Sequence, residues 1–198
     1  MLVVNSDYIL GIDLAGKEKN PTGIALWLGK RVETSIIYTD KEIMQLITEN
    51  KPKNVAIDAP LKLPKRGLFR KADKEMVKRG FRVFPPGLPS MRTLTLRAIK
   101  LNKLIAKEGI KTMEVHPTST RKALSMPVKN WVEIQKVLNA IGIEGSPKTR
   151  TLTSHEIDAI TAALTAYLHE RNLTEALGDD EEGYIIIPKR QDWRNIIL

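Results

Sequence analysis

The chain has 198 residues, of which 42% are hydrophobic and 28% charged, so its length and composition suit one soluble globular domain over residues 1–198. It contains no cysteine, which excludes disulfides and thiolate metal sites. It also lacks an apolar run long enough to cross a membrane, so we expect a cytoplasmic protein without a membrane segment. The net charge of +9 favours a polyanionic partner, and nucleic acid is the first candidate.

The first third of the chain has the pattern of an antiparallel meander followed by a helix and a further strand. Apolar runs separated by short turns predict three consecutive strands, over residues 8–14, 23–28 and 32–38. A helical periodicity then covers residues 40–50. Residues 54–57 are apolar and lead directly into Asp58, so the order of elements is β-β-β-α-β.

The segment that follows is the most basic part of the chain. Residues 62–82 hold nine basic and two acidic residues, a net charge of +7. We interpret residues 61–92 as an insertion that contacts phosphates, although a solvated lysine-rich helix is the plainer alternative. The side chains expected to bind nucleic acid are Arg66, Arg70, Lys71, Arg79 and Arg82.

Three phenylalanines accompany the basic residues of the insertion. Phe69, Phe81 and Phe84 offer surfaces on which bases could stack, or they belong to the core. Because aromatic residues are this few, we expect recognition of the nucleic-acid backbone rather than of the bases.

The second half of the chain alternates helical and extended patterns. We predict helices over residues 92–108, 128–141 and 153–171, and strands over residues 110–115 and 183–188. Thr153 and Glu156 have the spacing of a capping box at the start of the third of these helices. The acidic run 179–182 is expected to be a solvated loop.

Two of the predicted strands end in an aspartate within similar sequences, residues 11–14 (GIDL) and 56–59 (AIDA). If these strands are parallel neighbours, about 4.8 Å apart, Asp13 and Asp58 lie at the same edge of the sheet. That spacing suits two-metal sites, whose ions are about 3.5–4 Å apart. Oxygen ligands without cysteine select Mg²⁺ or Mn²⁺. One such aspartate alone is usually a turn former or a helix cap, but a matched pair favours a site.

Asp158 is the candidate for a third carboxylate ligand. It lies in the first turns of an alanine-rich helix, and small side chains would let that helix approach the sheet closely. The alternative is that Asp158 only complements the helix dipole.

Three further residues are weighed as parts of the same site. Glu114 is a catalytic candidate that could bind an outer metal or orient a water, and a salt bridge with a basic insertion residue is the alternative. His116 could shuttle protons near neutral pH or simply hydrogen-bond within its loop. His155 is expected near Asp158, as a group behind the metal ligands.

The chain resembles the family known as domain of unknown function 429, predicted nucleases with an RNase H-like fold that are related to RuvC and YqgF. The matching motifs are residues 11–16 (GIDLAG) with 21–23 (PTG), 56–60 (AIDAP), 82–86 (RVFPP), 114–117 (EVHP), 155–159 (HEIDA) and 182–184 (EGY). The resemblance implies an α/β fold with a mixed five-stranded sheet of order 3-2-1-4-5, flanked by helices, with the basic insertion after strand 4. It implies Asp13 on the first strand, Asp58 on the fourth and Asp158 on the last helix.

The leading hypothesis is a nuclease in which Asp13 and Asp58 share two Mg²⁺ or Mn²⁺ ions and Asp158 completes one coordination sphere. Two alternatives stay open. One is an ATPase or phosphotransferase of the actin-like superfamily, whose phosphate hairpin resembles the first hairpin here, although those enzymes clasp nucleotide between two such domains. The other is a nucleic-acid-binding module without activity. RuvC-like relatives often dimerise, so a homodimer is the assembly suggested by analogy.

Overall fold

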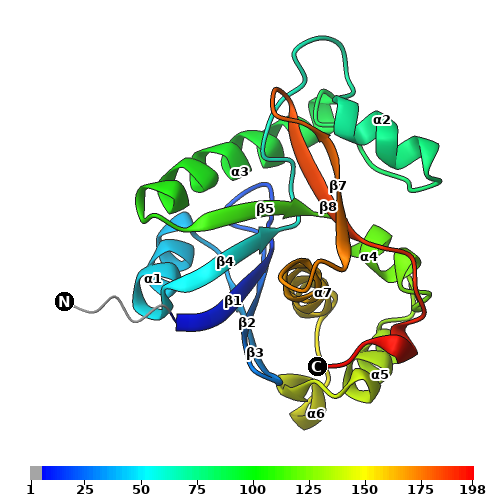
Figure 1. The fold of residues 1–198 in the computed structure, drawn as a ribbon. Coiled ribbons are helices and arrows are strands. Elements are labelled where there is room, and N and C mark those ends of the chain that lie inside the picture. Colours follow the sequence, from blue (N-terminus) through cyan, green and yellow to red (C-terminus); the bar gives the residue numbers. More distant parts are fainter. Residues whose placement is uncertain (1–5) are drawn as a thin grey trace.

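Eight strands form one mixed sheet in the computed structural model, which describes residues 6–198 (Figure 1). The strand order across the sheet is β6-β3-β2-β1-β4-β5-β8-β7. The strands are β1 (Ser6–Asp13), β2 (Thr22–Leu28), β3 (Arg31–Ile37), β4 (Pro52–Ile57), β5 (Lys111–Val115), β6 (Glu144–Gly145), β7 (Thr174–Asp179) and β8 (Gly183–Pro188).

The expected order 3-2-1-4-5 forms the middle of this sheet, but the expected total of five strands is wrong. The short strand β6 pairs with β3 at one edge, and the β7–β8 hairpin continues the sheet beyond β5 at the other. The physical reason is that β5 would otherwise present a row of unpaired backbone groups, which the apolar strand β8 satisfies through parallel pairing.

The pairing of β1 with β4 sets the position of the two strand-end aspartates. The strands run parallel, with Gly11 opposite Ala56 and Ile12 opposite Ile57. The backbone N–H of Asp58 continues this ladder and donates to the carbonyl of Ile12 at 2.8 Å. Asp13 and Asp58 therefore leave the sheet at the same edge, as the twin motifs predicted.

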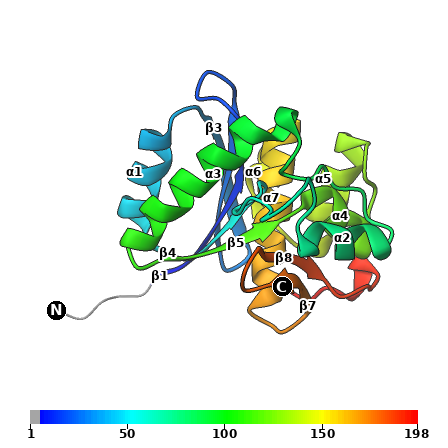
Figure 2. The same ribbon diagram turned by 90° about the horizontal axis from the view of Figure 1, so that it is seen from above.

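Helices cover both faces of the sheet (Figure 2). They are α1 (Asp40–Asn50), α2 (Lys71–Lys78), α3 (Pro89–Lys107), α4 (Pro117–Ala123), α5 (Trp131–Ile141), α6 (Ser146–Thr149), α7 (Ser154–His169) and the 3-10 turn η1 (Trp193–Asn195). Helices α1 and α3 lie on one face, and α7 lies on the other with α4 and α5 beyond it. No helix within residues 6–198 is long and apolar enough to span a membrane.

Helix α7 lies unusually close to the sheet because two glycines face it. A Cβ atom on Gly11 would lie 2.1 Å from the carbonyl oxygen of Ala159, and one on Gly23 would lie 2.1 Å from that of His155. Any larger residue at either position would push the helix away. The glycines of β1 and β2 thus bring the start of α7, with His155 and Asp158, to the edge that carries Asp13.

The basic insertion is not a free, solvated helix. Its helix α2 packs on the β7–β8 hairpin, where Ala72, Met76 and Phe81 join a buried cluster with Leu177 and Ile185. The insertion is therefore fixed beside the strand ends of β4 and β5 by an apolar core of its own.

Candidate active site

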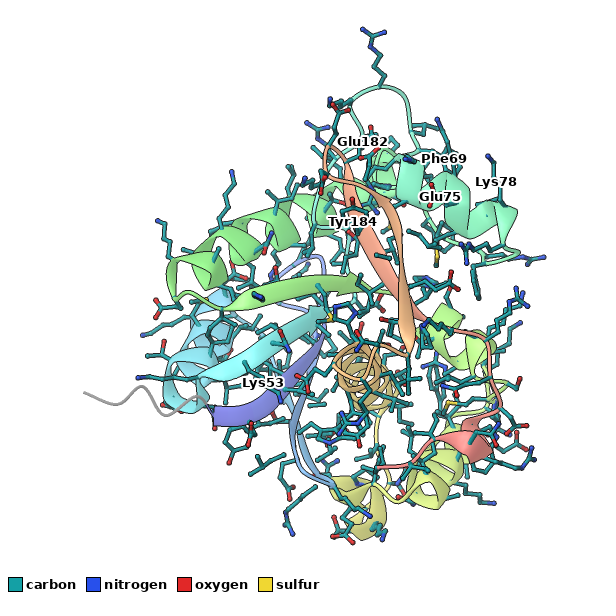
Figure 3. All side chains as sticks on the ribbon, in the orientation of Figure 1. Lys53, Phe69, Glu75, Lys78, Glu182 and Tyr184 are labelled. Atoms are coloured by element: carbon teal, nitrogen blue, oxygen red, sulfur yellow. The ribbon has the colours of Figure 1, made fainter. Side chains whose placement is uncertain are left out.

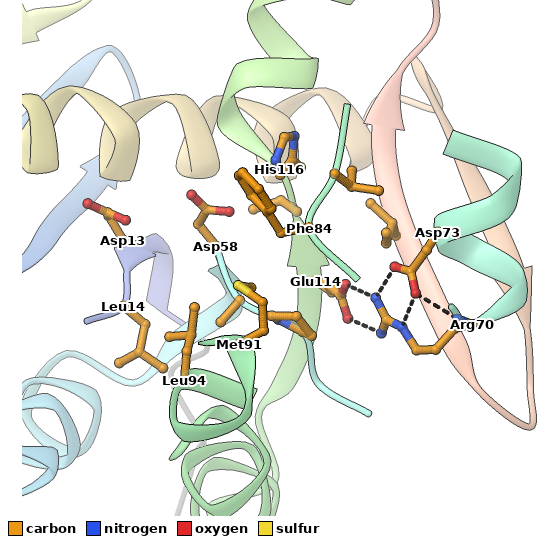
Figure 4. Close-up of a pocket in the computed structure, with 15 residues that line it drawn as sticks. Asp13, Leu14, Asp58, Arg70, Asp73, Phe84, Met91, Leu94, Glu114 and His116 are labelled. Carbon is orange, nitrogen blue, oxygen red and sulfur yellow. Dashed lines mark hydrogen bonds and ion pairs between the residues drawn. The ribbon is translucent and has the colours of Figure 1, made fainter. Parts of the chain in front are cut away.

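A pocket opens at the edge of the sheet where β1, β4 and β5 end (Figure 4). Asp13 and Asp58 point into it side by side, and Glu114, His116 and Phe84 are among the other residues that line it. We call Asp13, Asp58 and Asp158 the aspartate edge.

Asp13 is partly buried, and its carboxyl group has a raised pKa. Burial raises its pKa to about 6, the negative charge of Asp158 adds to the effect, and a hydrogen bond with His155 opposes it. His155 Nδ1 lies 2.6 Å from Asp13 Oδ2. His155 therefore orients Asp13, one of the predicted metal ligands, and its charge also acts on Asp158, near which we expected it.

Asp58 is perturbed in the same direction. Burial raises its pKa well above the ordinary value, and the charges of Asp13 and Asp158 raise it further. When both carboxylates are ionised they repel each other in a buried setting, and a cation between them would offset this repulsion.

Asp158 reaches the same edge but already has a cationic partner. Burial raises its pKa, while the charge of Arg121 lowers it. Arg121 Nη1 donates a charge-assisted hydrogen bond to Asp158 Oδ1. Within residues 6–198, no three His, Asp or Glu side chains are arranged to enclose a metal ion. The three predicted aspartates thus lie close enough for their charges to affect one another, and Asp158 forms an ion pair with Arg121.

Sequence reasoning missed Arg121. It is one of 32 basic residues in the chain, and nothing in its local sequence distinguishes it. Its burial arises only when α4 docks against α7, where Thr120 and Thr165 share a hydrogen bond of 2.8 Å.

Glu114 lies in the same pocket, but both oxygens of its carboxylate already accept hydrogen bonds. It accepts hydrogen bonds from Arg70 at 2.7 and 2.5 Å, and from the backbone N–H of Leu61 at 2.8 Å. Arg70 also bonds Asp73 through Nε and Nη2, at 3.2 and 2.9 Å. This cluster, which we call the Arg70 anchor, ties the insertion to β5 and matches the salt-bridge alternative for Glu114.

Arg70 was expected to bind nucleic acid, and the structure contradicts this. Its side chain is 1% exposed, and each nitrogen of its guanidinium donates to Glu114 or Asp73. Burial works against its charge, yet the two carboxylates raise the pKa of Arg70 above its ordinary value. The arginine is therefore a charged internal support rather than a phosphate ligand.

The other basic residues proposed for binding are on the surface. Arg66 and Arg82 are exposed, Lys71 lies 4.0 Å from Asp179, and Arg79 pairs with Glu175. Lys71 directly follows Arg70 and Arg82 directly precedes Val83, and Arg70 and Val83 both line the pocket.

The acidic run 179–182, expected to be a solvated loop, instead contacts the insertion. Glu182, which is labelled in Figure 3 at the tip of the hairpin, accepts hydrogen bonds from the backbone N–H groups of Lys65 and Lys71, at 2.7 and 2.9 Å. Glu181 pairs with the Lys65 side chain. The tip of the β7–β8 hairpin thus neutralises part of the basic insertion and holds the start of α2.

The three phenylalanines of the insertion have different environments. Phe81 is buried in the cluster beneath α2, as the core alternative predicted. Phe69 is partly exposed, whereas Phe84 is 74% exposed at the rim of the pocket. Of the three, Phe84 is the ring that is both open to solvent and beside the aspartate edge.

His116 is the N-cap residue of α4, and its pKa lies well below neutral pH. Its Nδ1 lies 2.7 Å from Ser119 Oγ and accepts from the Ser119 N–H. Burial lowers the pKa of His116 to about 4, and the charge of Arg121 adds to the effect. The ring is therefore neutral at pH 7, which favours the structural alternative.

The fold is similar to that of two solved structures of RuvC. For T. thermophilus RuvC in complex with a Holliday junction substrate, the TM-score is 0.51 at 14% identity, covering 83% of this chain and 95% of that one. For a second Thermus thermophilus RuvC structure the TM-score is 0.49 at 16% identity, covering 83% and 96%. The sequence matches no family model and no curated protein, so the resemblance to family 429 rests on its motifs alone. At this identity the first likeness supports the RNase H-like fold, which this chain shares with RuvC.

Proposed function

We propose that this protein is a nuclease that hydrolyses phosphodiester bonds of DNA or RNA at the aspartate edge. The observation that carries the proposal is the pair Asp13 and Asp58, which share one pocket and whose pKa values are both raised by burial and by neighbouring negative charge. Clustered acids of perturbed pKa in a cleft are typical of functional sites. The solved RuvC structure of similar fold contains a Holliday junction, which agrees with a nucleic-acid substrate.

A divalent cation suits this pair of carboxylates. Both offer hard oxygen ligands, and their mutual repulsion is what a bound cation would offset. Asp13 and Asp58 would therefore hold Mg²⁺ or Mn²⁺, and Asp158 can add its Oδ2, since Arg121 bonds only Oδ1. In such sites the ion supplies charge stabilisation at the phosphate and activation of water.

The remaining residues of the site would position the substrate and the acids. His155 fixes the orientation of Asp13 through its hydrogen bond, and the Arg70 anchor keeps the insertion in place beside the pocket. The exposed side chains of Arg66, Lys71, Arg79 and Arg82 would follow the phosphate backbone. Phe84 offers an uncovered ring at the rim on which a base could stack.

One observation favours a second candidate, a nucleic-acid-binding module without activity. Asp158 is already paired with Arg121, so the three acids are not all open to metal ions. Such a module would bind nucleic acid with a steep salt dependence, in the presence of a chelator, and would not turn substrate over. No comparable observation favours the actin-like ATPase.

The test is cleavage of four-way DNA junctions, duplex DNA, single strands and RNA by the full chain with Mg²⁺ or Mn²⁺. Asp58→Asn should lower the rate roughly 100-fold or more, because it removes a charged ligand at the reacting centre. Asp7→Asn is the matched control, because Asp7 is an exposed aspartate at the opposite end of β1. The nuclease assignment fails if Asp58→Asn cleaves as fast as the parent.

A further inference from the structure

Arg121 is a fully buried arginine with fewer partners than its charge requires. It is 0% exposed, and among residues 6–198 its ion pair is with Asp158. Its other contacts are the ring of Trp131, whose centroid lies 5.4 Å from the guanidinium carbon, and the Thr161 and Thr118 oxygens, which lie 3.3 and 3.4 Å from its nitrogens. Within the described residues its Nε is buried without a hydrogen-bond acceptor. Burying a guanidinium in this way is costly unless negative charge surrounds it.

The surrounding negative charge is the aspartate edge. Besides its bond to Asp158, the positive charge of Arg121 lowers the pKa of Asp13 and of Asp58, against the larger effect of burial. The same charge disfavours protonation of His116 on the other side. The guanidinium therefore lies within electrostatic reach of the whole site. By contrast, the Arg70 anchor has two carboxylates that satisfy its arginine completely.

The charges of this site limit how many metal ions it can hold. Metal ligands must be deprotonated, and three deprotonated aspartates with Arg121 carry a net charge of −2, which one divalent ion balances. A second divalent ion would turn the site to +2 and would also lie close to a fixed guanidinium. Two divalent ions about 3.5–4 Å apart would repel each other and the guanidinium, and Arg121 already offsets one of the three carboxylate charges that oppose this repulsion.

We propose that Arg121 is a resident cation of this site that takes the place of one of two metal ions, so that each chain binds a single divalent ion. This inference rests on the proposed metal site of the nuclease and specifies its composition. Arg121 would hold Asp158 in position through Oδ1 and supply fixed positive charge beside the ion held by Asp13 and Asp58.

The experiment is a titration of the full chain with Mn²⁺, without nucleic acid. Calorimetry and electron paramagnetic resonance of the free ion measure how many equivalents of Mn²⁺ each chain binds. The parent should bind one equivalent. Arg121→Gln keeps polar atoms but removes the charge, and it should bind two equivalents because Asp158 is released. Arg121→Lys keeps the charge and should again bind one. The double variant Arg121→Gln, Asp158→Asn should return to one, since the released ligand is gone.

Two equivalents in the parent overturn the proposal, and so does one equivalent in an Arg121→Gln variant whose near-ultraviolet circular dichroism is native. If Arg121→Gln does not fold, the parent and Arg121→Lys decide, and two equivalents in either overturns the proposal. A parent that binds no Mn²⁺ overturns it as well. Failure of the nuclease function is a separate result, because one bound equivalent without cleavage of any substrate would leave the resident cation intact.

Discussion

Two clusters of buried charge lie side by side in this protein, and they differ in how well their charges are matched. In the Arg70 anchor, one arginine meets two carboxylates, and every guanidinium nitrogen and both oxygens of Glu114 are bonded (Figure 4). In the aspartate edge, three carboxylates share one arginine, and Asp13 and Asp58 carry raised pKa values. Matched charge supports the fold, whereas unmatched charge is available to a ligand.

The largest expected effect comes from breaking the matched cluster. Arg70→Met should lower the free energy of unfolding by about 3–5 kcal/mol, because Glu114 and Asp73 would remain buried without a cation. The measurement is urea denaturation at pH 7, followed by circular dichroism. Asp58→Asn is the comparison, and it should leave stability unchanged or higher because it removes repulsion. Equal losses in the two variants would contradict the distinction between the clusters.

A smaller effect should appear in the pH dependence of stability. The folded pKa of Asp13 is raised from 3.8 to about 6, so the folded state binds the proton more tightly than the unfolded chain does. Its contribution is present below pH 4 and is lost as the pH rises to about 6, a change of roughly 3 kcal/mol. Asp13→Asn should abolish this contribution.

His116 must be separated from Asp13 in this measurement. Its pKa is lowered to about 4, so its contribution has the opposite sign and grows as the pH rises from 4 to about 6.5. The informative quantity is therefore the difference between parent and Asp13→Asn in unfolding free energy at pH 4, 5 and 6. A difference that does not change with pH would refute the raised pKa. Added Mn²⁺ should stabilise the parent most at pH 7, where Asp13 is ionised.

The pair Asp13 and Asp58 could be predicted because each lies at the end of a short apolar strand. The parallel pairing of those strands was implied by the family resemblance, and the structure has it. The capping box of Thr153 and Glu156 at the start of α7 was equally readable, because both partners lie within one helical turn. Such features depend on residues close in sequence, so one sequence contains them in full.

The roles of individual charges could not be predicted, because they depend on contacts between distant segments. Arg70 meets Glu114 across 44 positions, and Arg121 meets Asp158 across 37. In the sequence Arg70 is one member of a basic run, and nothing there separates it from Arg82. The outer strands were missed for a related reason, since β6 has two residues and β7 few apolar ones, and both exist only through their partners.

The smallest expected effect is that of replacing Arg82, an exposed arginine in the same insertion as the buried Arg70. Arg82→Ala should weaken binding of nucleic acid by one phosphate contact and lower the slope of log K against log salt by about 0.9 for duplex DNA. Its folding stability should stay within about 0.5 kcal/mol of the parent, because the residue is exposed. Fluorescence anisotropy with a labelled duplex at several salt concentrations, in the presence of chelator, measures the slope. Arg194→Ala removes an exposed arginine that pairs with Asp192 outside the insertion, so it should leave the slope unchanged. If both variants lower the slope equally, general charge rather than the insertion attracts the nucleic acid, and the basic surface beside the aspartate edge loses its proposed role.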